Sequence, residues 1–155
     1  MFRPTLIELF WLALAFAISV LICLAIFGRS LVGGSVDIQL YDTYFVLSSA
    51  WVVFPLFLIV SFLLFLVKEG RIRFSRTLPN LIILVLGLLL VILFSRMSVA
   101  ITKLWTSVSV LPSPDQPTPL EDPFVVIMTN SLIGLQVAVT LALVLVGFYW
   151  GKRRG

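Results

Sequence analysis

The chain has 155 residues, of which 61% are hydrophobic and 12% charged, and its formal net charge is +4. A mean hydropathy of +1.17 excludes an ordinary water-soluble globular protein, because too few polar residues remain to form a surface that faces water. The positive charge does not indicate nucleic-acid binding, since the basic residues cluster beside apolar runs and form no face with stacking aromatic residues. Lipid is the expected solvent. Helices are the expected fold, because they satisfy their own backbone in hydrocarbon.

The first apolar run, at residues 7–27, is long enough to cross a bilayer, and only Glu8 interrupts it near one end. Arg3 precedes the run, which raises the alternative of a cleaved signal peptide. The run is longer than such a segment needs, and no small-x-small cleavage site follows it. We therefore expect this helix to remain in the mature protein. Cys23, the single cysteine, lies in mid-run and is expected to be a small buried hydrophobe.

The second run, at residues 44–67, contains Pro55, which is expected to bend or loosen the helix. The third run has a short uninterrupted core, so the predicted helix over 78–98 spans the membrane only if it continues past Ser95 with Arg96 reaching outward. The fourth run, 124–150, is long and ends in aromatic residues typical of the membrane interface. Gly87, Gly134 and Gly147 offer places for close contact between helices.

The loop at residues 95–123 has two parts. In its first half Met97, Ile101, Leu104 and Val108 fall on one helical face, which predicts a separate helix lying on the outer interface. The second half, PSPDQPTPLEDP, is rich in proline and is expected to be an extended connector.

The basic residues predict the topology. One cluster lies between the second and third helices and another follows the fourth, and both belong on the cytoplasmic side by the positive-inside rule. The clusters are Lys68, Arg71, Arg73 and Arg76, and Lys152, Arg153 and Arg154. The sequence therefore predicts one all-α membrane domain, a bundle of four transmembrane helices with both termini in the cytoplasm. We expect the bacterial inner membrane ahead of an organellar one.

The loop between the first two helices, VGGSVDIQLYDTYFVL, carries two acids, a threonine and two tyrosines beside the membrane. It resembles a segment of subunit I of the haem-copper oxidases, where a GG…D-x-x-L-H-D-T-Y-Y-V pattern opens the tenth helix. The matching residues are Asp37, Leu40, Asp42, Thr43, Tyr44 and Val46. The resemblance implies that the four helices correspond to the ninth to twelfth of that subunit, with this loop on the outer side.

The departures from the family pattern fall on the residues that do its chemistry. Ser49 and Trp51 stand where the family has two haem-ligating histidines, and neither replaces imidazole as an iron ligand. Tyr41 stands where the family has a histidine that helps to hold magnesium, so Asp42 alone offers at most a weak metal site. Ser113 and Pro114 follow the Leu111-Pro112 turn, where the family has two arginines for the haem propionates. The chain has no histidine at all.

These features predict a non-catalytic relative of the oxidase subunit, with no catalytic residue and no cofactor of its own, serving as an accessory or structural subunit of a respiratory membrane complex. Asp42 and Thr43 are expected to cap the second helix, with Tyr41 and Tyr44 anchored at the interface. Lipids and other membrane subunits are the expected partners. The polar residues of the helices are expected to hydrogen-bond between helices, or to bond their own helix backbone. They are Ser48, Ser49, Ser61, Asn130 and Gln136.

Two alternatives stay open. One is a fragment of a split oxidase in which other chains supply every histidine. The other is a small transporter or lipid-binding protein whose motif match is fortuitous, although such a protein ordinarily needs a charged or strongly polar group within the span. An independent enzyme is not expected, because the sequence offers no nucleophile and base pair.

Overall fold

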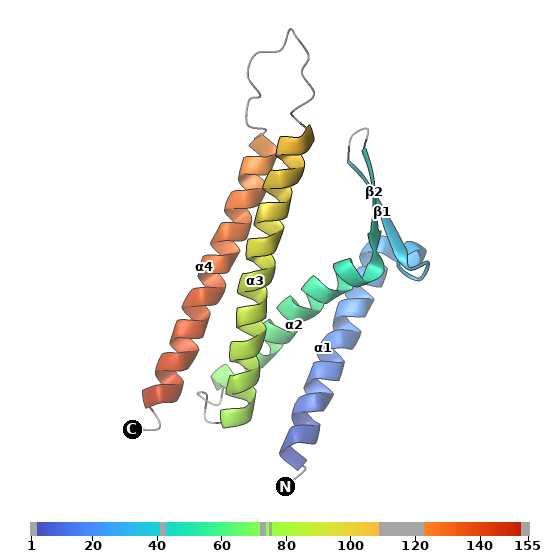
Figure 1. Ribbon diagram of the computed structural model, residues 1–155. Helices are drawn as coiled ribbons and strands as arrows, with labels where there is room; N and C mark the ends of the chain where they lie inside the picture. Colours follow the sequence, from blue (N-terminus) through green and yellow to red (C-terminus); the bar gives the residue numbers. More distant parts are fainter. Residues whose placement is uncertain (1–2, 41–42, 72–73, 75, 109–122, 153–155) are drawn as a thin grey trace.

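The computed structural model describes residues 3–40, 43–71, 74, 76–108 and 123–152. Four long helices account for most of them, and a small two-stranded sheet lies between the first two (Figure 1). The elements in chain order are α1 (Arg3–Phe27), the short 3-10 helix η1 (Gly28–Leu31), β1 (Ser35–Leu40), β2 (Thr43–Ser48), α2 (Ser49–Arg71), α3 (Thr77–Val108) and α4 (Pro123–Lys152).

The four predicted helices are confirmed as helices long and apolar enough to cross a membrane. Their candidate spans contain 23, 23, 27 and 28 residues, against about 20 needed for the hydrocarbon core. The apolar side chains that point outward are large, among them Phe10 and Phe16 of α1 and Phe148 of α4. Such faces suit a hydrocarbon solvent, in which the hydrogen bonds of the helix backbone are already satisfied.

The segment that was expected to open the second helix is instead a β-hairpin. Strands β1 and β2 are antiparallel, and their register runs from Ser35 opposite Ser48 to Leu40 opposite Thr43. The helix α2 begins only at Ser49, so the predicted start at residue 44 was wrong, and Thr43 cannot cap that helix. The sequence of β2, TYFVLS, is rich in β-branched and aromatic residues, which favour a pleated strand over a helix. β1 contributes Val36 and Ile38.

The third helix is longer than predicted. It runs without interruption from Thr77 to Val108, so the expectation of a separate interfacial helix beginning near Met97 was wrong. No glycine or proline occurs between Leu88 and Val108 to end a helix. The proline-rich connector predicted for the following residues lies outside the described part of the chain.

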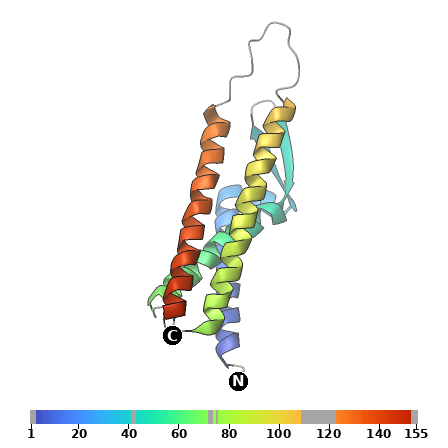
Figure 2. The ribbon, with the colours of Figure 1, turned by 60° about the vertical axis from the view of Figure 1, so that its left-hand side comes forward.

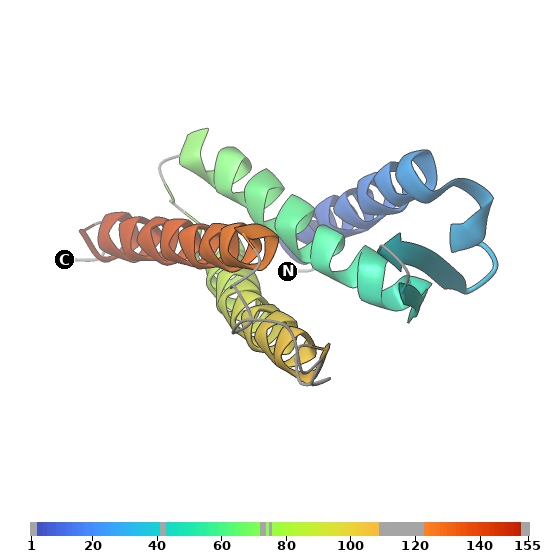
Figure 3. The same ribbon diagram turned by 90° about the horizontal axis from the view of Figure 1, so that it is seen from above.

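The helices pack in chain order, α1 on α2, α2 on α3, and α3 on α4. Seen from above, α2 crosses between α1 and the α3–α4 pair (Figure 3). The first turn of α1, the last turn of α2, the first turn of α3 and the last turn of α4 lie toward one end, and the hairpin extends from the other end of α1 and α2 (Figures 1 and 2).

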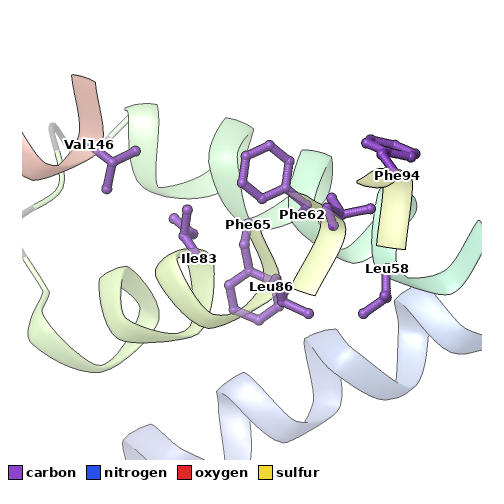
Figure 4. Packing of buried hydrophobic residues seen from close by; sticks show 8 residues of the cluster. Leu58, Phe62, Phe65, Ile83, Leu86, Phe94 and Val146 are labelled. Carbon is purple, nitrogen blue, oxygen red and sulfur yellow. The ribbon is translucent and has the colours of Figure 1, made fainter. Parts of the chain in front are cut away.

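The main core lies where α2, α3 and α4 meet. Phe65 and Ile83 are completely buried there, and Val146 adds a contact from α4 (Figure 4). The whole cluster consists of Leu58, Phe62, Phe65, Ile83, Leu86, Leu90, Phe94 and Val146. A second, smaller cluster of Cys23, Leu31 and Val36 joins the end of α1 to the hairpin, which confirms Cys23 as a buried apolar residue.

The α3–α4 contact depends on Gly87. A Cβ atom added there would lie 2.5 Å from Cδ2 and 2.9 Å from Cγ of Leu143, so the close contact predicted for this glycine is confirmed. Gly134 and Gly147 have no neighbouring atom within 4 Å of such a Cβ. The close contacts predicted for these two glycines are therefore absent from the described structure.

Candidate functional site

Of the residues that the motif singles out, the described ones lie in the two strands of the hairpin. Asp37 and Leu40 belong to β1, and Thr43 and Tyr44 belong to β2. Tyr41 and Asp42 lie outside the described residues. The prediction that Asp42 offers a weak metal site therefore concerns a residue that the structure does not describe. Within the described part of the chain, no group of three or more Cys, Asp or Glu residues is placed to hold a metal ion.

Ser49 joins the hairpin to the rest of the fold. Its Oγ donates to the carbonyl oxygen of Leu31 at 2.9 Å, and its backbone N–H donates to the carbonyl oxygen of Gly34 at 3.1 Å. Gly34 has a φ of 81°, a conformation that glycine adopts without strain. Ser49 was predicted to hydrogen-bond to another helix or to its own. It instead hydrogen-bonds to the segment that connects α1 to β1. Ser48 is exposed at the end of β2.

The other residues singled out for helix contacts are Pro55 in α2 and Asn130 and Gln136 in α4. Pro55 lies half-buried within α2, which continues through it. Gln136 is half-buried and Asn130 is exposed on α4. No hydrogen bond to either side-chain amide is present within the described chain. The hydroxyls of Ser131 and Thr140, by contrast, donate to carbonyls of their own helix at 2.8 Å.

A group of charged and buried polar side chains lies at the end of the molecule away from the hairpin, among them Glu8, Lys68 and Glu69. Lys68, near the end of α2, donates from Nζ to Oε2 of Glu8 in α1 at 2.5 Å. The side chains are only 14% and 6% exposed, so the pair is largely shielded from solvent. The same Lys68 Nζ lies 5.3 Å from the ring centre of Trp11 and 5.2 Å from that of Phe65. Aromatic faces at this distance stabilise the ammonium further.

Glu69, the next residue, is in a different situation. It is completely buried, and neither carboxylate oxygen has a hydrogen-bond partner. Lys68, Arg76 and Glu8 all lie close enough to interact with it electrostatically. A buried carboxyl group without hydrogen bonds costs free energy. Native proteins retain such groups most often where they have a function.

The turn from α2 to α3 is held by a short chain of hydrogen bonds. The N–H of Phe74 donates to the carbonyl oxygen of Glu69 at 3.0 Å, and Nδ2 of Asn80 donates to the carbonyl oxygen of Phe74 at 2.8 Å. Phe74 has a φ of 56°, which is unusual for a residue with a side chain. Asn80 is completely buried and its Oδ1 has no partner. The oxygen atoms of Glu69 and Asn80 are thus unpaired near the same turn.

Two grooves flank the Glu8–Lys68 pair. One has a volume of about 590 Å³ and is lined by Ile7, Glu8, Arg76, Thr77, Leu78 and Pro79. The other, of about 610 Å³, is lined by Trp11, Leu63, Leu64, Val67, Lys68 and Arg71. Both grooves have mostly apolar walls and at least one basic residue, a combination that suits an amphipathic ligand.

Sequence reasoning missed this site because it treated its residues separately. Glu8 was noted only as an interruption of the first apolar run, and Lys68 only as part of a basic loop. One signal was available, since the predicted topology already placed the start of the first helix and the end of the second on the same side. An acid and a base at equal depth in adjacent helices are natural partners.

Comparison of the chain with protein-family models, with curated proteins and with solved structures gives no match.

Proposed function

We propose that this chain is a non-catalytic membrane subunit that associates side by side with another membrane protein, and that α4 provides the contact. The observation that carries the proposal is Asn130, an exposed amide that no described residue satisfies. It lies about 10 Å into the helix, at about 1.5 Å per residue, and within the candidate span that begins at Val125. Lipid chains offer such an amide no hydrogen bond.

The surroundings of Asn130 suit a helix contact. Only 11% of the apolar window of α4 is buried, against 39% for α3, so α4 has the largest face left for a partner. Gly134 lies one turn further along, is exposed and has open space around its Cα. A small residue one turn from a polar one allows another helix to approach closely enough for an interhelical hydrogen bond, which is worth about 0.6 to 2 kcal/mol.

The proposed partner is a respiratory complex of the cytochrome oxidase type, and this choice rests on the motif resemblance alone. The hairpin found at residues 35–48 differs from the helix start that the family has at its motif. Trp51, at one of the positions of a haem ligand, is 70% exposed on α2. A structural subunit accommodates both departures, because such a subunit does not need to hold a haem.

We further propose that both termini and the α2–α3 turn face the cytoplasm and that the hairpin faces outward. The basic residues near the α2–α3 turn and after α4 support this orientation. It is tested in intact cells with the Cys23→Ala chain carrying one new cysteine. Asp42→Cys should react with an impermeant thiol reagent, while Arg73→Cys should react only after the membrane is opened. The reverse pattern contradicts the orientation.

Association is tested by purifying the tagged full chain in mild detergent and measuring the native mass of what accompanies it. We expect a redox membrane protein in the complex. Asn130→Leu should release it, whereas Ser131→Leu should not, because Ser131 already bonds its own helix. Recovery of the lone chain, or equal effects of the two variants, contradicts the proposal.

A further inference from the structure

The groove between α1 and α2 has the form of a lipid site. We infer that it binds one anionic phospholipid, with the phosphate held by Arg71 and an acyl chain along the apolar wall. This inference does not depend on the proposed partner, because the groove lies on α1 and α2 and the proposed contact lies on α4. The six residues that line the groove are Trp11, Leu63, Leu64, Val67, Lys68 and Arg71.

The groove runs along the helix axis in the direction that an acyl chain needs. Leu63, Val67 and Arg71 are spaced four residues apart, so they lie on one face of α2. Leu63 and Val67 are 52% and 60% exposed, and they provide an apolar strip that ends at the basic residue. Eight residues of helix cover about 12 Å at about 1.5 Å per residue, which is the length of a substantial part of an acyl chain.

The charge at the end of this strip is available to a ligand. The ammonium of Lys68 already pairs with Glu8, and that pair is neutral as a unit. Arg71 is exposed in the last turn of α2, and no ion pair to it is present among the described residues. Its side chain tilts back toward the start of the helix, over the groove. A guanidinium binds a phosphate with two parallel hydrogen bonds.

The net charge of the site favours an anionic lipid over a zwitterionic one. Arg76 lines the groove on the other side of the Glu8–Lys68 pair and adds a second positive charge at this end of the molecule. The nearby Glu69 contributes at most one negative charge, so this end keeps a net positive charge. A zwitterionic headgroup brings its own cation, which offsets the attraction of the phosphate to these residues. Each basic residue near an anionic membrane surface adds to this attraction.

The experiment measures lipid retention by native mass spectrometry. The full chain is exchanged into detergent with equal amounts of phosphatidylglycerol and phosphatidylcholine. We expect one retained lipid, predominantly phosphatidylglycerol. Arg71→Gln should lower the bound fraction about fivefold, the equivalent of about 1 kcal/mol. Arg96→Gln is the matched control, because Arg96 is also exposed but lies on α3, outside the groove residues.

A second pair of variants tests the apolar wall. Val67→Trp should fill the groove and abolish retention, whereas Val144→Trp, on an equally exposed position of α4, should leave it unchanged. Equal retention of the two lipids, or equal effects of Arg71→Gln and Arg96→Gln, overturns the inference. Displacement of the bound lipid by excess inorganic phosphate also overturns the inference. That result would mean that the groove binds simple anions and that the acyl chain contributes nothing to binding.

Discussion

Lys68 Nζ and Glu8 Oε2 lie 2.5 Å apart and join two helices through residues 60 positions apart in the chain. Because both side chains are largely buried, neither charge has water as an alternative partner. The loss of one member therefore leaves the other as an uncompensated charge in a low-dielectric environment. This contact fixes the start of α1 against the end of α2.

We expect Glu8→Leu to destabilise the protein by about 3 kcal/mol, since it leaves the ammonium of Lys68 buried without its carboxylate. The free energy of unfolding is measured by titration with a denaturing detergent. The double variant Glu8→Leu with Lys68→Leu should recover most of the loss, because two apolar side chains need no partner. A double variant as unstable as the single one contradicts this account of the pair.

Glu69→Leu is expected to have the opposite effect to Glu8→Leu. Neither oxygen of Glu69 is hydrogen-bonded, so the substitution removes two unsatisfied buried atoms and should raise the free energy of unfolding by about 1 to 2 kcal/mol. The same detergent titration compares the two variants. A large loss of stability in Glu69→Leu means that this carboxyl group has a partner in the folded chain, for which Lys68 and Arg76 are the candidates.

Gly87→Ala should weaken the contact between α3 and α4. The new methyl group meets three atoms of Leu143 within 3.0 Å, and we expect a net loss of about 1 to 3 kcal/mol from overpacking. Gly134→Ala is the control, since its methyl group meets nothing and alanine favours the helix by about 1 kcal/mol. In a double-mutant cycle, Leu143→Ala should remove most of the penalty at Gly87. Additive effects contradict the contact.

Ser49→Ala should loosen the hairpin. The variant loses the hydrogen bond from Oγ to Leu31 at a cost of about 1 kcal/mol, while Ser48→Ala, at an exposed position, should cost little. Amide hydrogen exchange in detergent provides the local measurement, and faster exchange is expected in β1 and β2 of the Ser49 variant. If exchange is equally slow in both variants, other contacts hold the hairpin.

The difference between residues 44–48 and the rest of the second span shows where sequence reasoning reached its limit. Tyr44 to Leu47 are apolar or aromatic and adjoin a long apolar run, so hydropathy alone assigns them to the helix. Their alternative is to pair with Val36 to Gln39, and that pairing depends on a segment the hydropathy pattern treats as a separate loop. Strand pairing is a non-local property, so a pattern within one window could not decide it.

The candidate site was also predictable only in its local features. Glu8, Lys68 and Arg71 were each visible as charges near the ends of apolar runs, but Lys68 and Arg71 were assigned to the loop after the second helix, whereas α2 extends to Arg71. Which charge is paired, which is buried without a partner and which is free depends on how α1, α2 and α3 cross. That crossing is set by contacts such as Phe65 with Ile83 in the core, and many residues of similar size satisfy the same hydropathy pattern.

The sequence by itself determined that there are four long apolar helices and that the chain has no histidine to ligate a haem iron, because apolar length and residue type are local properties. The tertiary structure decided that the motif forms a hairpin, that Gly87 receives Leu143, and that Glu8 satisfies Lys68 while Glu69 stays unpaired. These relationships join residues that are distant in the chain, and their free energies depend on burial and distance, which only the packed helices define.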